Sequence, residues 1–268
     1  MCSCHQSGHH HEQETVSRRH LLKTLAGGTA IALAPGCASV ATAFTPSPAQ
    51  MAQAAAPAWD QLKQQQRVST NSRYTSRVNR VAPRVLRAAG ENPSDWEVQT
   101  FDDPSLNAFA LPNNKIGIHT GILDIMENDD QIAVVLGHEV GHVKLNHSGQ
   151  RYGQAAATQL GLGVAGAVLD SRNVQNSQSI MQALGLGAQV GFLLPYSRDH
   201  ELEADRLGLR YMPNANYDPR EALTFWTRMA NAKAQAAGSP PEFLSTHPAD
   251  ATRINFIRQE LEVMGYRV

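Results

Sequence analysis

Apolar positions change their spacing from one part of the chain to the next. Between residues 59 and 89 they recur every three or four positions, which predicts one or two amphipathic helices. Residues 96–101, 107–111 and 116–120 instead alternate or form short apolar runs that end at Pro, Asn or Gly, which predicts three strands. We expect these strands to form one small antiparallel sheet.

The rest of the pattern is helical. Asn128-Asp129-Asp130 supplies N-cap residues for a helix from about Gln131 to Leu145, whose first half is strongly apolar. Further helices are predicted at residues 198–212, 219–236 and 249–264. The predicted fold class is therefore α+β, mainly α, with a single functional domain over residues 59–268.

Two Gly/Ala-rich apolar segments, residues 155–169 and 180–194, interrupt this series. Each is 15 residues long, whereas a membrane-spanning helix needs about 18 to 20 apolar residues. They are predicted to be buried or groove-lining helices.

The N-terminal residues have the layout of an export signal. Arg18-Arg19 precedes Leu21-Leu22-Lys23, a Gly/Ala-rich stretch follows, and small residues stand at 41–43. The paired arginines resemble a twin-arginine signal. Residues 1–43 are therefore predicted to direct the protein to the periplasm, and residues 44–58, rich in Ala, Pro and Gln, to form a flexible tether.

Two processing routes are open for this signal. Cleavage after Ala43 would release a soluble periplasmic protein, whereas cleavage before Cys37 would give a lipoprotein attached to the membrane through the lipidated Cys37. The sequence 33–37 resembles a lipobox, but proline before the glycine and alanine three positions before the cysteine weaken the match. We therefore favour the soluble form.

Composition excludes several classes of protein. The 268 residues carry a formal net charge of −1, so the basic face of a nucleic-acid-binding protein is not expected. The three cysteines all lie within the first 37 residues, which argues against a disulfide scaffold or a cysteine-ligated zinc module in the body of the protein. No feature of the sequence indicates an oligomeric state.

The strongest chemical signal is His138-Glu139-Val140-Gly141-His142, within the predicted helix 131–145. Residues four apart lie on one face of a helix, so both imidazoles can bind one metal ion. Glu139 is then placed to reach a metal-bound water. This is the H-E-x-x-H arrangement of zinc peptidases.

A third metal ligand is needed, because a catalytic zinc site has three protein ligands and one open position. With no cysteine available, it must be His, Glu or Asp. Glu201 and Asp205 are four residues apart on the predicted helix 198–212, so one can bind the metal while the other accepts a hydrogen bond from a ligand histidine. The alternative is a solvated charged face paired with Arg198 and Arg206.

Two other histidines are not assigned to the site. His147 follows His142 by five residues, about 140° further round a continuous helix, and is predicted to be structural. His200 adjoins Glu201 but points to another side of its helix.

These motifs resemble those of the gluzincin zinc metallopeptidases of the HtpX/BepA/LoiP type, the family of the CAAX prenyl protease. The resemblance covers about residues 65–268 and is closest to the exported branch. The matching residues are His138-Glu139-x-x-His142, Glu201-x-Glu203-Ala204-Asp205, Asn107-Ala108-Phe109, and Ser245-Thr246-His247-Pro248 with Arg253. It implies a zincin-like metallopeptidase domain with a small antiparallel sheet beside an active-site helix.

The resemblance also implies a role for each residue. His138, His142 and Glu201 would bind one Zn²⁺ per chain, and Asp205 would contact these ligands without binding the metal, as would Arg253. His247 would line the cleft. The chemistry of peptide hydrolysis adds that either His247 or Arg253 could stabilise the oxyanion. Asn107 and Ala108 would begin the strand pair beside the active site. Independently of the resemblance, an edge strand near residues 107–111 or 116–120 could pair with an extended substrate, with Asn107 and Ala108 as the expected binding residues.

The expected function is a zinc-dependent endopeptidase of the bacterial cell envelope. It would hydrolyse peptide bonds in unfolded or damaged envelope proteins with a zinc-activated water and Glu139 as general base. The alternative is a zinc-containing chaperone-like or binding factor of the envelope with little proteolytic activity.

Overall fold

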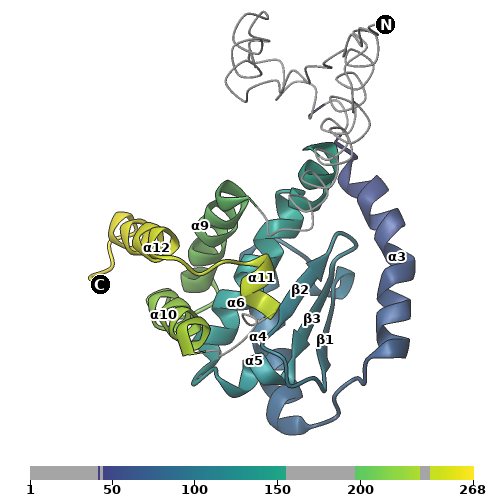
Figure 1. Ribbon diagram of the computed structural model, residues 1–268, viewed down its shortest axis with the longest axis horizontal. Helices are drawn as coiled ribbons and strands as arrows, with labels where there is room; N and C mark the ends of the chain where they lie inside the picture. Colours follow the sequence, from purple (N-terminus) through teal and green to yellow (C-terminus); the bar gives the residue numbers. More distant parts are fainter. Residues whose placement is uncertain (1–41, 43–44, 155–196, 236–241) are drawn as a thin grey trace, which may run out of the picture. The chain divides into compact units, whose positions relative to one another are not determined.

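The computed structural model in Figure 1 describes residue 42 and residues 45–154, 197–235 and 242–268. Nearly all of the predicted export signal, including Cys37, lies outside the described residues. So do the two Gly/Ala-rich segments. Among the helices that are described, none is long and apolar enough to cross a membrane.

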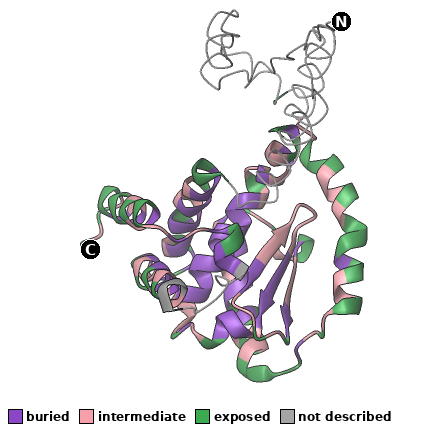
Figure 2. Ribbon diagram, in the orientation of Figure 1, coloured by how far each residue is buried: buried purple, intermediate pink, exposed green. Residues whose placement is uncertain are grey.

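Helix α6 (Asp129–Lys144) confirms the helix predicted over residues 131–145, and it is the centre of the fold. The Asn128 side chain accepts a hydrogen bond from the Gln131 backbone N–H at 2.9 Å and caps its first turn. Every residue from Gln131 to His142 is buried, so this helix is surrounded by other elements on all sides (Figure 2).

Helix α9 (Arg198–Asn214) packs tightly against α6. Small residues line the contact: a Cβ atom on Gly141 would lie 3.0 Å from the Ala204 carbonyl oxygen, and one on Gly137 would lie 3.1 Å from the Gly208 Cα. Because neither helix has a large side chain here, the two backbones approach closely and their polar residues are brought together.

The sheet has three strands, β1 (Glu97–Phe101), β2 (Ala108–Leu111) and β3 (Lys115–His119), in the order β1-β3-β2. Strand β3 is antiparallel to β2, as predicted, but parallel to β1. The expectation of an antiparallel sheet is therefore wrong for the β1–β3 pair. After β1 the chain crosses to the position of β2, and the β2–β3 hairpin then places β3 between β1 and β2. The sheet is therefore mixed.

Helix α3 (Pro48–Gln65) replaces most of the predicted flexible tether. Ser47 and Gln50 form a capping box at its start. Trp59 is buried, with its ring centroid 5.9 Å from that of Phe101 on β1, and Lys63 pairs with Glu97 at 3.2 Å. The Ala- and Gln-rich composition is typical of linkers, but both residues also favour helices, and Trp59 anchors this one to the sheet.

The remaining elements complete the core. They are α4 (Ser72–Ala88), the short 3₁₀ helix η1 (Pro93–Asp95), α5 (Thr120–Asp124), α10 (Glu221–Gln235), α11 (Glu242–Thr246) and α12 (Ala251–Val263). Helix α4 contributes an apolar stripe to the core that includes Val78, Val81 and Val85. Helices α10 and α12 pack with α6 and α9 on the side away from the sheet (Figure 1).

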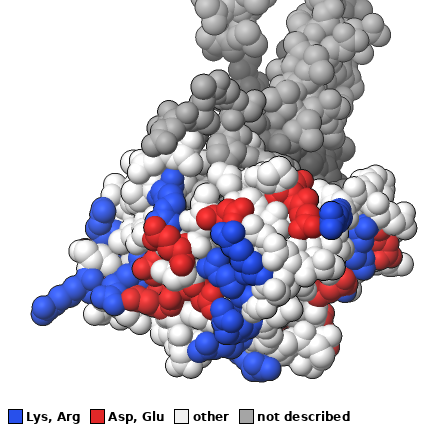
Figure 3. Space-filling view, turned by 90° about the horizontal axis from the view of Figure 1, so that it is seen from below, with Lys and Arg blue, Asp and Glu red and all other residues white. Residues whose placement is uncertain are grey.

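Charges of both signs are mixed on the face shown in Figure 3. Several charges also pair with each other: Arg77 and Arg80 of α4 both pair with Asp129, at 3.3 and 2.7 Å. This mixed surface agrees with the near-neutral composition.

Candidate metal centre

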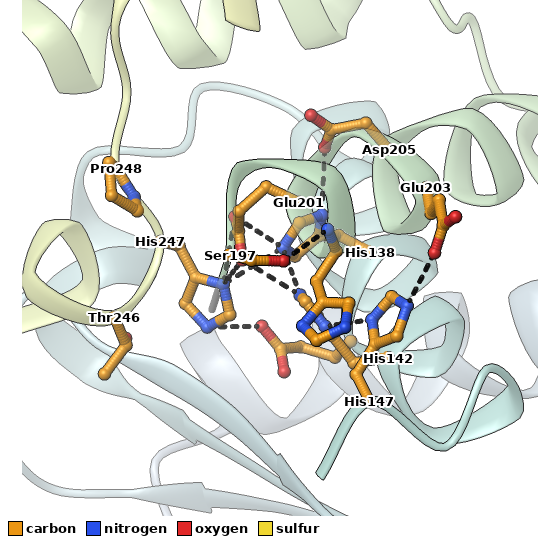
Figure 4. Close-up of polar contacts among 12 residues, drawn as sticks. His138, His142, His147, Ser197, Glu201, Glu203, Asp205, Thr246, His247 and Pro248 are labelled. Carbon is orange, nitrogen blue, oxygen red and sulfur yellow. Dashed lines mark hydrogen bonds and ion pairs between the residues drawn. The ribbon is translucent and has the colours of Figure 1, made fainter. Parts of the chain in front are cut away.

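Two histidines of α6 converge below α9 (Figure 4). His138 and His142 are buried, and their Nε2 atoms lie 2.9 Å apart. Their spacing of four residues puts both rings on one side of the helix, as the sequence predicts.

The structure adds two donor groups to this pair. The Glu201 carboxylate of α9 lies 3.4 Å from His138 Nε2 and 3.3 Å from His142 Nε2. His247, just after α11, places its Nδ1 3.1 Å from His138 Nε2 and 3.0 Å from Glu201 Oε1. The four donor atoms all lie within 4.8 Å of one another.

This donor set fits zinc. Tetrahedral zinc with bonds of about 2.0–2.1 Å holds its donor atoms about 3.3 Å apart, close to the separations observed here. Imidazole nitrogen and carboxylate oxygen are also donors that zinc accepts. Of the two carboxylates that the sequence left open, that of Glu201 lies within the group of donor atoms, whereas that of Asp205 contacts His138 Nδ1.

Glu139 lies beside this cluster. It is buried, and its Oε1 has no hydrogen-bond partner among the described residues, although His247 Nε2 is within ion-pair distance at 3.5 Å. A buried carboxylate oxygen without a hydrogen bond is costly to the fold, so its position indicates a chemical role.

Asp205 and Arg253 support His138 from behind. Asp205 Oδ1 accepts a hydrogen bond from His138 Nδ1 at 2.9 Å, and Arg253 Nε donates to Asp205 Oδ2 at 2.6 Å. Arg253 also contacts Glu201 Oε2 at 2.8 Å and lies over the Trp226 ring at 3.4 Å. Arg253 thus lies between the buried carboxylates of Glu201 and Asp205. With the nearby Glu139, three buried carboxylates share one arginine, and a divalent ion would help to balance their charge.

These charges shift the ionisation of the groups around them. Burial and Arg253 oppose protonation of His138, but Glu201 and Asp205 outweigh them and raise its pKa to about 9 in the metal-free site. Burial raises the pKa of Asp205, yet Arg253 and His138 hold it below its usual value. Burial and the nearby His138 lower the pKa of His142 well below the usual value.

His142 has a different support, which the sequence analysis missed. His147 Nδ1 lies 2.8 Å from His142 Nδ1, and His147 Nε2 lies 3.1 Å from Glu203 Oε2 (Figure 4). The His147 ring also stacks on His200, with centroids 4.3 Å apart. Burial lowers the pKa of His147 to about 3.

The reason for the missed contact is a break in the helix. Helix α6 ends at Lys144, and Asn146 adopts φ of 52°, a left-handed conformation, before helical structure resumes. His147 therefore does not lie where a continuous helix would put it. Asparagine shortly after a helix end is a known stop signal, and it was the available clue to this turn.

The predicted substrate-binding residues lie at the start of β2. The Asn107 carbonyl accepts a hydrogen bond from the His119 N–H at 3.0 Å, and Ala108 pairs with Ile118 of β3. By the alternation of an antiparallel pair, the backbone groups of Ala108 and Ala110 point away from β3, toward the outer edge. Ala108 is fully buried, whereas Ala110 is partly exposed.

Comparison with known proteins agrees with this geometry. Residues 69–261 match the model of peptidase family M48. The chain belongs to this family. As an M48 protein with a buried four-donor site, it uses zinc as its metal.

Its relatives include mitochondrial metalloendopeptidases and a bacterial protease. The mitochondrial metalloendopeptidase OMA1 of Schizosaccharomyces pombe is 36% identical over 184 residues, which is 69% of this chain and 52% of the relative. Human OMA1 is 30% identical over 216 residues, 75% of this chain and 40% of the relative. The beta-barrel assembly-enhancing protease of Escherichia coli is 26% identical over 195 residues, which is 71% of this chain and 39% of the relative. This M48 chain thus spans about half the length of these relatives, or less.

Proposed function

We propose that this M48 protein is a zinc endopeptidase of the bacterial cell envelope that cleaves unfolded or damaged proteins. The observation that carries the proposal is Glu139, whose buried Oε1 has no hydrogen-bond partner among the described residues and stands beside the metal-binding donor set. A purely structural zinc site has no use for such a carboxylate, whereas hydrolysis requires a base at this place.

The residues divide the chemistry among them. When bound to His138, His142 and Glu201, zinc supplies a Lewis acid that polarises a carbonyl oxygen and lowers the pKa of water to about 7. Glu139 accepts the proton of the attacking water and delivers it to the leaving amine. Asp205 holds the Nδ1 proton of His138, so that Nε2 stays directed at the metal.

His247 has to change its contacts during this cycle. Its Nδ1 completes a set of four donors, and a catalytic zinc site keeps one position open. We propose that His247 moves away from the other three donor residues when substrate enters and then donates a hydrogen bond to the oxyanion. Arg253 is already engaged by Asp205 and Glu201, so it orients these carboxylates and does not take this role.

The outer edge of β2 is the proposed place for the substrate backbone. An extended peptide that pairs with a strand edge is held by main-chain hydrogen bonds and with little sequence preference, which suits unfolded proteins. Pairing would begin near the partly exposed Ala110. Asn107 and Ala108 would take part only after the contacts that bury them have opened.

The envelope location rests on the sequence of residues 1–43, with release after Ala43 favoured over lipid attachment at Cys37. The E. coli relative is named for enhancing beta-barrel assembly. The OMA1 relatives are named as mitochondrial, so the location is tested separately, by fractionating cells that express the full chain and its Cys37→Ala variant.

The decisive experiment compares the full chain with its Glu139→Gln variant. Zinc content is measured by elemental analysis, and cleavage is measured with casein as an unfolded substrate. Glu262→Gln, at an exposed position of α12, is the matched control. We expect about one zinc per chain in all three proteins and cleavage in all but Glu139→Gln, which should lose about 10²- to 10⁴-fold.

Other results would reject the proposal in distinct ways. Zinc binding without cleavage by the unmodified chain would favour the chaperone-like or binding factor. Equal cleavage by Glu139→Gln would remove Glu139 from the mechanism. Absence of zinc from every variant would reject the metal centre itself.

A further inference from the structure

Two residues next to the metal centre have no part in the mechanism described so far. His147 is fully buried, and its two ring nitrogens point in opposite directions, one at His142 and one at Glu203 (Figure 4). Glu203 belongs to α9, two residues after Glu201, but its side chain is 49% exposed.

Metal binding fixes where the protons of these rings lie. His142 offers its Nε2 to the donor set, so a neutral ring must carry its proton on Nδ1. Nδ1 of His147 lies 2.8 Å away and has to accept that proton's hydrogen bond. The proton of His147 is then on Nε2, which donates to the Glu203 carboxylate at 3.1 Å.

Each ring thus donates a hydrogen bond to the next group, His142 to His147 and His147 to Glu203. We infer that His147 and Glu203 are positioning residues for the zinc ligand His142, with His147 transmitting the effect of the Glu203 carboxylate to the metal site. Metal-bound histidines are generally held by a hydrogen bond from their second nitrogen, which fixes the ring and makes it a stronger donor. Here a second histidine is placed between the ligand and the carboxylate.

The local structure is consistent with this role. The left-handed turn at Asn146 brings the His147 ring onto His142. His200 stacks on the other face of the same ring, and its Nε2 contacts Gln150 Oε1 at 3.2 Å. The ring of His147 is therefore held between fixed neighbours and has little freedom to turn away from His142.

The inference rests on the proposed zinc site, so the test measures metal binding directly. Variants of the full chain are loaded with zinc in competition with a chromogenic chelator, and separately with Co²⁺, whose visible absorption reports ligand geometry. His147→Leu removes both hydrogen bonds. His147→Asn keeps an acceptor near His142 Nδ1 but is too short to reach Glu203. Glu203→Gln removes the carboxylate charge, and Asp199→Asn removes an exposed charge from the same helix as a control.

We expect His147→Leu to weaken zinc binding by about 10- to 100-fold and Glu203→Gln by about tenfold, each with a shifted Co²⁺ spectrum. His147→Asn should lose less than His147→Leu. In the His147→Asn background, Glu203→Gln should have no further effect, because the connection is already broken. Asp199→Asn should bind zinc as the unmodified chain does.

Glu203→Gln is decisive if the His147 variants fail to fold, because Glu203 is half exposed. Unchanged zinc affinity and Co²⁺ absorption in Glu203→Gln would overturn the inference, and so would an equal effect in the presence and absence of His147. If Glu139-dependent cleavage persists in that case, the proposed function stands and only the positioning role fails. If the unmodified chain binds no zinc, both fail together.

Discussion

The two histidines of α6 belong to the same group of donor residues but lie in different surroundings. His138 is held by Asp205 and Arg253, which are fully enclosed and charged. His142 is held by the buried His147, and the charge behind it, Glu203, stands at the surface. The surroundings of His138 therefore depend on a balance of buried charges, those of Asp205 and Arg253. Those of His142 instead place the charged Glu203 at the surface, connected to His142 by hydrogen bonds through the His147 ring.

The largest expected effect is on stability, on the His138 side. Asp205→Asn leaves Arg253 buried without its closest carboxylate, and breaking a buried ion pair in this way costs about 3–5 kcal/mol of unfolding free energy. Glu203→Gln, at a half-exposed position, should cost about 1 kcal/mol or less. Urea unfolding of both variants with a chelator present measures the contrast, and equal losses would show that the two sides do not differ.

The second prediction concerns pH. With its pKa raised to about 9, His138 holds a proton at neutral pH that zinc must displace, whereas the lowered pKa of His142 requires no such step. Apparent zinc affinity should therefore rise by about tenfold per unit between pH 7 and pH 9. Without metal the sign is opposite: charged His138 stabilises the fold below about pH 6.5, and this contribution is lost toward pH 9.

Chelator competition at pH 7, 8 and 9 tests the affinity. Zinc binding that does not change over this range would mean that His138 is already neutral. In the Asp205→Asn variant the rise with pH should be smaller, since one of the charges that raise the pKa of His138 is gone.

The smallest expected effect is at the turn that places His147. Alanine in a left-handed conformation costs about 1 kcal/mol or somewhat more, whereas glycine adopts it without steric penalty. Both Asn146→Ala and Asn146→Gly lose the hydrogen bond to the Pro46 carbonyl, so their difference isolates the backbone. We expect Asn146→Ala to be less stable than Asn146→Gly and to bind zinc more weakly. Equal behaviour would show that the turn does not position His147.

Much of the site was predictable because it depends on helix geometry alone. A capped helix over residues 131–145 and the spacing of His138 and His142 require both rings on one face, whatever surrounds them. The same rule pairs Glu201 with Asp205. The choice between these two carboxylates was not decided by spacing, because it depends on which turn of α9 faces α6, and that depends on the close contact of Gly141 with Ala204.

The sheet and the N-terminal helix show a similar division. Alternating residues located all three strands, but the partner of each strand depends on how the chain crosses between β1 and β2. Composition alone led to a flexible segment at residues 44–58, whereas Trp59, just beyond it, anchors α3 against Phe101. The composition of this segment is compatible with both a linker and a helix, and the packing of Trp59 against Phe101 favours the helix.

The sequence by itself pointed to His138, His142 and Glu139 and to the helix that carries them, because these follow from periodicity and from the chemistry of side chains a few positions apart. Only the tertiary structure decided that His247 is a fourth donor, that Arg253 lies between two buried carboxylates and that His147 reaches His142. Each of these contacts joins residues across a helix break or between separate elements, where no fixed spacing relates sequence to distance. Packing of the whole domain, through small residues and buried charges, sets those distances.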